Sequence, residues 1–78
     1  MPKDPKQAIV WYTRSAEQGY APAQVELGVM YHNGEGAPAD DAKAASWLRQ
    51  AVELGYAPGK QLLDALQQEQ AGKAPAKP

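Results

Sequence analysis

The sequence predicts an all-α fold, a short right-handed α/α superhelix of about four antiparallel helices. Residues 19–22 read Gly-Tyr-Ala-Pro, and residues 55–58, which lie 36 positions further on, read the same. In the same register, Trp11 recurs as Trp47. Apolar residues between these landmarks recur every three or four positions, as they do on amphipathic helices. A repeat period in the thirties is typical of stacked helix pairs.

The first helix is expected over residues 5–18. Asp4 is placed to cap its N-terminus, because a short side-chain acceptor there binds backbone N–H groups that have no partner in the helix. Gly19 can end the helix in the left-handed conformation. The second helix is expected over residues 22–33, and its few polar positions predict that it lies between two other helices.

A glycine-punctuated elbow follows the second helix. Gly34 and Gly36 permit the positive φ angles that end a helix and reverse the chain. Pro38 prevents the helix from continuing, and Asp40 is a good N-cap for the next one. These residues therefore predict the turn of a helical hairpin.

The third helix is expected over residues 41–54, ended by Gly55. The fourth is expected over residues 58–70, and its narrow apolar stripe is typical of a terminal helix with one buried side. Residues 4–70 are thus expected to form the domain. Residues 71–78 contain only Ala, Gly, Lys and Pro, a composition that predicts disorder.

The composition argues against several classes of protein. There is no cysteine, so disulfides and thiolate metal sites are excluded, and a net charge of −1 gives no basic surface for nucleic acid. The longest run of bulky apolar residues, residues 9–12, is too short to cross a membrane. Residues 1–4 lack the apolar core of a signal peptide. We expect a soluble protein, with cytoplasm and periplasm both left open.

A series of spaced small, aromatic and charged residues runs through the middle of the chain: Ala23, Leu27, Gly28, Tyr31, Gly34, Gly36, Asp40, Lys43, Ala44, Trp47, Ala51 and Gly55. This pattern resembles the Sel-1-like repeat family, an α/α solenoid related to tetratricopeptide repeats. One full repeat would cover residues 21–56, flanked by half-repeats over residues 4–20 and 57–70. The resemblance implies a non-catalytic interaction module or scaffold that binds a protein or peptide partner.

The last half-repeat departs from this pattern. Gly59 stands where the full repeat has Ala23, and Asp64 stands where it has Gly28. A glycine at the latter position lets two helices approach closely, whereas a buried aspartate without a partner would be destabilising. We therefore expect the fourth helix to end the stack, as at the C-terminal end of a repeat array.

By analogy with tetratricopeptide repeats, the first helices of successive repeats line a concave face. The residues expected to bind a partner there are Val25, Val29, His32, Asn33, Gln61, Ala65 and Gln68. Polar side chains with small apolar spots suit an extended peptide or a helix. The identity of the partner is not encoded in this pattern.

The first helix suggests an alternative function. Ile9 and Val10 are bulkier than Ala45 and Ser46, which hold the matching positions one repeat later. They contact something outside this chain, or contact a second copy and make a homodimer, or complete the end of a small core. A structural capping or self-associating segment is therefore the second hypothesis.

The remaining polar residues form no pattern typical of a catalytic or metal-binding site. His32 has neither a cysteine nor a second histidine at metal-binding spacing, and Ser15 and Ser46 lie in no strand-turn-helix elbow. We expect no catalytic residue, no cofactor and no metal. Structural roles are expected instead for Trp11, Gly28, Tyr31, Gly34, Gly36, Asp40, Trp47 and Gly55, with both tryptophans in the core.

Overall fold

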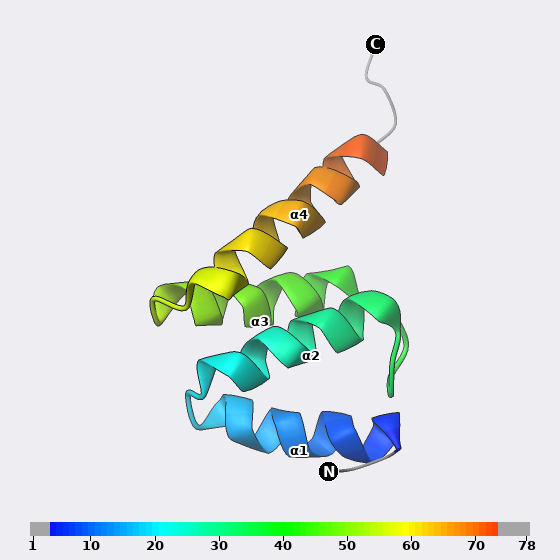
Figure 1. Ribbon diagram of the computed structural model, residues 1–78. Coiled ribbons are helices and arrows are strands. Elements are labelled where there is room, and N and C mark those ends of the chain that lie inside the picture. Colours follow the sequence, from blue (N-terminus) through cyan, green and yellow to red (C-terminus); the bar gives the residue numbers. More distant parts are fainter. Residues whose placement is uncertain (1–3, 74–78) are drawn as a thin grey trace.

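The computed structural model describes residues 4–73, which form four helices joined by short turns (Figure 1). The helices are α1 (Pro5–Glu17), α2 (Ala21–Asn33), α3 (Asp41–Glu53) and α4 (Ala57–Lys73). Within the described part of the chain there is no strand, so the predicted all-α fold is confirmed. The fourth helix continues past the expected end at Gln70, and the rest of the expected tail, residues 74–78, lies outside the described residues.

Side-chain caps begin two of the helices as the sequence predicts. The Asp4 carboxylate accepts a hydrogen bond from the backbone N–H of Lys6 at 3.0 Å, and the Asp40 carboxylate accepts one from Lys43 at 3.0 Å. Gly55 follows α3 with φ of 82°, in the left-handed region expected for a residue that ends a helix. These local signals fix where the helices start and stop.

The elbow between α2 and α3 is folded back against α1. Gly34 caps α2 in the left-handed conformation, and the Asp40 N–H donates to the Tyr31 carbonyl oxygen at 2.8 Å. Gly36 has φ of 79°, and a Cβ there would overlap the carbonyl oxygen of Pro5. Glycine is therefore required at position 36 both for the turn and for the close approach to the first turn of α1.

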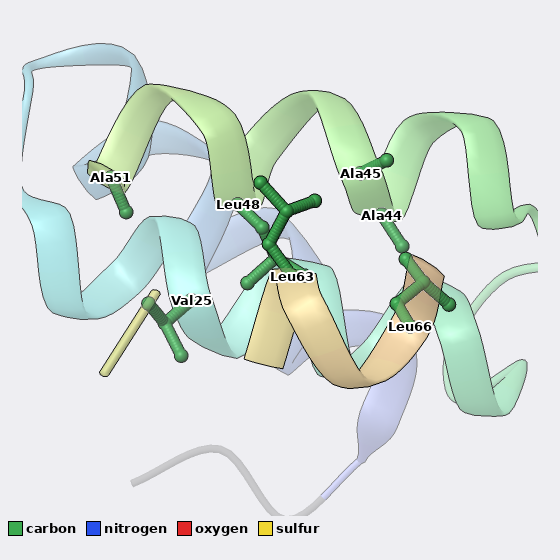
Figure 2. Close-up of a cluster of buried hydrophobic side chains, with 7 residues drawn as sticks. All are labelled: Val25, Ala44, Ala45, Leu48, Ala51, Leu63 and Leu66. Atoms are coloured by element: carbon green, nitrogen blue, oxygen red, sulfur yellow. The ribbon is translucent and has the colours of Figure 1, made fainter. Parts of the chain in front are cut away.

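The core consists of two clusters on opposite sides of α2. The α1–α2 cluster joins Ile9, Ala16, Ala23, Leu27 and Met30. The α3–α4 cluster is drawn in Figure 2, where side chains of α4 point towards α3; its members are Val25, Ala44, Ala45, Leu48, Ala51, Leu63 and Leu66. Tyr31 is partly buried and packs against both clusters. The predicted position of α2 between two helices is confirmed, since it packs on both α1 and α3.

Two glycines allow the helices to pack closely. A Cβ on Gly28 would lie 2.7 Å from Leu48 Cγ, and a Cβ on Gly59 would lie 2.9 Å from the Ala51 Cβ. Gly28 thus allows α2 to approach α3, as the sequence predicts. Gly59, which replaces the alanine of the full repeat, does the same between α3 and α4.

Among the residues whose burial is described, one polar side chain lies inside the fold. Gln24 is only 2% exposed, and its Nε2 donates to the Ala16 carbonyl oxygen near the end of α1 at 3.1 Å. Its Oε1 accepts no hydrogen bond within the described residues. Gln24 therefore links α2 to the C-terminal turn of α1, where helix carbonyls lack partners in the helix.

The prediction that both tryptophans are core residues is wrong for Trp11. Trp47 is half-buried and packs against the α1–α2 cluster, whereas Trp11 is 62% exposed. The two residues hold equivalent helical positions, but only α3 has a helix pair packed on that side. Helical periodicity therefore identifies a side that can be covered, without showing that it is covered.

Candidate interaction groove

An apolar concavity lies between α2 and α4, over α3. It has a volume of about 130 Å³ and is lined by Gly28, Val29, His32, Leu48, Leu62, Ala65, Leu66 and Glu69. We call this the α2–α4 groove. Apart from His32 and Glu69, every lining residue is apolar.

The groove follows from the path of α4. At its start, α4 lies close to α2: a Cβ added to Gly59 would be 3.5 Å from Val25 Cγ2. Further along, α4 diverges from the other three helices (Figure 1). Leu62, Leu66 and Glu69 recur every three or four residues and so lie on one side of α4. The divergence leaves this side open towards α2.

A histidine and two carboxylates meet beside the groove, and two of the three residues also line it. His32 Nδ1 lies 2.7 Å from Asp41 Oδ1, and its Nε2 lies 3.4 Å from Glu69 Oε2. The carboxylate of Asp41 is an acceptor, so Nδ1 donates to it. Because the three residues belong to α2, α3 and α4, the contacts orient the imidazole between the helices. Among residues with described positions, no group of three potential ligands is arranged to hold a metal ion.

The structure brings only part of the predicted concave surface together. Val29, His32 and Ala65 line the groove, while Asn33, Gln61 and Gln68 are exposed outside its lining.

Val25 was also predicted to lie on the concave face, but the structure buries it. It is 7% exposed and belongs to the α3–α4 cluster. The reason is that the first turn of α4 covers it, so the open part of the groove begins one helical turn later.

The residues that give the groove most of its apolar character were not among the predicted binding residues. Leu48 is supplied by α3, the helix that the analogy left out of the concave face. Leu62 and Leu66 belong to the narrow apolar stripe that was expected to form the buried side of the fourth helix, although Leu62 is exposed. The spacing of Leu62, Ala65, Leu66 and Glu69 was the available signal, since these positions share one side of a helix.

Two other predicted features are placed differently by the structure. Ile9 is buried in the α1–α2 cluster, whereas Val10 is 50% exposed, so the two residues do not form one outward patch. Adjacent helical residues point about 100° apart, which separates them. Ser15 and Ser46 lie on α1 and α3, and the His32 ring nitrogens face carboxylates rather than either hydroxyl.

Helix pairs that repeat with a fixed period and stack side by side define an α/α repeat protein. The family model of the Sel1 repeat matches residues 1–20 and 21–56, and the chain belongs to the Sel1 repeat family. The second match has the bounds expected for the full repeat. Members of this family are non-catalytic repeats that mediate protein–protein interaction. No curated protein matches the chain, and no helix among the described residues is long and apolar enough to cross a membrane.

Proposed function

We propose that this chain is a protein-interaction module that holds a helix or extended peptide of a partner against the α2–α4 groove. The observation that carries the proposal is a concavity of about 130 Å³ with an almost entirely apolar lining. A cavity of about 150 Å³ lined by aliphatic residues binds benzene. The groove therefore has room for one leucine-sized or phenyl-sized side chain.

The surroundings of the groove suit a single anchor on a longer segment. Asn33, Gln61 and Gln68 are exposed near it on α2 and α4, and their amides can bond the backbone or polar side chains of a partner. The apolar side chain would supply most of the binding energy, as anchors in desolvated pockets usually do. One anchor on two helices covers less than a standard interface, so the affinity is expected to be modest.

The test fills the groove without disturbing the core. Ala65 is an exposed helical residue in the lining, and Ala65→Phe places a ring where the anchor would enter. Ala42→Phe makes the same change at an exposed position of α3 outside the lining. Peptides selected from a random displayed library on the unmodified chain are labelled, and binding to the three proteins is measured by fluorescence anisotropy.

The selected peptides should bind the unmodified chain and Ala42→Phe equally and lose about tenfold or more in affinity on Ala65→Phe. Circular dichroism of both variants establishes that they remain helical. Equal binding to Ala65→Phe, or peptides without an apolar residue needed for binding, would show that the groove is not the site.

A capping role for α4 is compatible with this function. Its outward side carries Lys60, Gln61, Asp64 and Gln67, all exposed. Stacking another helix there would bury Asp64 and Lys60, which is unfavourable without partners for their charges. In this proposal α4 both ends the stack and forms one wall of the groove.

A further inference from the structure

A second surface, on the outward side of α1, has no place in the function proposed above. Three of the large apolar residues exposed among the described residues gather there: Val10 is 50% exposed, Trp11 62% and Tyr20 60%. Shallow hollows lie on either side of the Trp11 indole, one reaching Lys6 and Val10, the other Tyr20, with Arg14 lining both. We call Lys6, Val10, Trp11, Arg14 and Tyr20 the α1 outer face. Exposed apolar patches of this kind commonly mark interaction sites.

The residues one repeat later show what packs on these positions when they are covered. Trp47 and Tyr56 are the residues 36 positions after Trp11 and Tyr20, and both are partly buried. Trp47 packs against side chains of α1 and α2, and Tyr56 packs against the α3–α4 cluster, which includes Val25 of α2. At the covered copy of this surface, aliphatic side chains on helices therefore contact the aromatic rings.

The α1 outer face differs from its covered copy at three positions. Lys6 corresponds to Ala42, Val10 to Ser46 and Arg14 to Gln50, and all three α3 residues remain exposed although α1 and α2 lie nearby. One more helix pair stacked in the same way would therefore cover Trp11 and leave Lys6, Val10 and Arg14 in solvent. A partner that uses the whole face has to extend across these three side chains.

The charges on this face indicate the chemistry of that partner. The hollows beside Trp11 are lined by two cations, Lys6 and Arg14, and by no carboxylate. Among the described side chains, neither cation takes part in an ion pair. Lys6 lies in the first turn of α1, where the helix dipole disfavours positive charge. An acidic partner would complement both residues.

A second copy of the chain fits this face poorly. Head-to-tail stacking would place Trp11 against the outward side of α4, where Lys60 and Asp64 would be buried. A two-fold contact between two α1 helices would bring together two surfaces with the same excess of positive charge. With 13 residues, α1 is about 20 Å long. A contact along a helix of this length buries a small area whatever the partner, so binding at this face is expected to be of modest affinity.

We infer that the α1 outer face binds an amphipathic helix of a partner protein, with aliphatic residues over Val10 and Trp11 and carboxylates opposite Lys6 and Arg14. The indole and the Tyr20 ring provide apolar contact area, and the two cations orient the helix. This surface lies on α1 and the turn that follows it, and it shares no residue with the α2–α4 groove, so the two sites can be occupied independently.

The test uses two labelled helical peptides of equal length with the same leucine stripe. One carries glutamates beside the stripe, and the other carries lysines at those positions. Binding to the full chain is measured by fluorescence anisotropy at low ionic strength and again with added salt. The variants are Trp11→Ala and Arg14→Glu, with Arg49→Glu as the matched charge reversal at an exposed position of α3 and Ala65→Phe as the groove control.

The acidic peptide should bind with about tenfold or greater affinity than the basic one, and added salt should weaken its binding. Trp11→Ala and Arg14→Glu should each reduce its affinity about tenfold, while Arg49→Glu and Ala65→Phe leave it unchanged. Arg14 also lies in the last turn of α1, so circular dichroism is used to establish that Arg14→Glu remains folded. Equal binding of the two peptides, or no binding of either, would overturn the inference. A dimer in sedimentation equilibrium that dissociates on Trp11→Ala would also overturn it, because the occupant would then be a second copy.

Discussion

Replacement of Gly36 by alanine tests the contact between the elbow and the first turn of α1. Gly36 has φ of 79°, and its added Cβ would overlap the Pro5 carbonyl oxygen and lie 2.8 Å from the carbonyl carbon. Both obstructing atoms are backbone atoms, so rotation of a side chain cannot relieve the overlap. The elbow must then move away from α1, or the first turn of α1 must unwind.

The expected loss of stability follows from two contributions. The left-handed conformation costs a residue with a Cβ about 1–2 kcal/mol, and forcing atoms into a close contact costs about 1–3 kcal/mol. Alanine also restricts the unfolded chain, which returns about 0.4–1 kcal/mol. We expect a net loss of about 2–4 kcal/mol. A domain of this size holds about 3–5 kcal/mol in total, so Gly36→Ala should be largely unfolded on mild heating.

Two other glycines separate these contributions. Gly19 has φ of 88° with nothing within 4 Å of an added Cβ, and Gly34 has φ of 73° with its nearest contact at 3.4 Å. Gly19→Ala and Gly34→Ala should therefore show the conformational cost alone, about 1 kcal/mol. The free energy of unfolding is measured by urea titration followed by circular dichroism. Equal losses in all three variants would refute the contact between the elbow and Pro5.

Five further substitutions test the core and the α3 cap by the same measurement. Trp47→Ala should lower the free energy of unfolding by up to about 3–5 kcal/mol, because the indole packs on the α1–α2 cluster. Trp11→Ala should change it by about 0.5 kcal/mol or less, because this indole is exposed. Similar losses in the two variants would contradict the difference in exposure. Asp40→Ala should lower the free energy of unfolding by about 1 kcal/mol, because the α3 cap is lost. An unchanged free energy of unfolding would show that the cap does not stabilise the fold. Gln24→Glu should lower the free energy of unfolding by more than about 2 kcal/mol, because it puts a carboxylate at a buried position. The control Gln50→Glu, at an exposed position, should leave it unchanged. Unchanged stability of Gln24→Glu would mean that water reaches this site.

Local signals in the sequence were sufficient to predict the helices. Asp4 and Asp40 are caps in the structure because the capping interaction depends only on residues two or three positions away. Gly28 was predicted as a point of close helix approach because its position in the repeat pattern has that role. The end of α4 was predicted less well, since nothing in the Gly-Lys-Ala composition stops a helix at Gln70.

The lining of the candidate groove could not be predicted from patterns within single helices. Val25 and Val29 are one helical turn apart, and only the crossing of α4 decides that the first is covered and the second lines the groove. In the same way, Trp11 and Trp47 have equivalent positions and different exposures, because a residue's burial depends on the elements that pack against its helix. A pattern within one helix cannot predict the path of its neighbours.

The position of Tyr31 bears on how this molecule melts. Its ring packs against both clusters, which otherwise lie on opposite sides of α2. In a linear stack, each helix senses only its neighbours, so cooperativity between the two halves has to pass through α2. Tyr31, which belongs to α2 and contacts both clusters, is therefore expected to couple the melting of the two halves. Its removal should let α3 and α4 lose structure at a different temperature from α1.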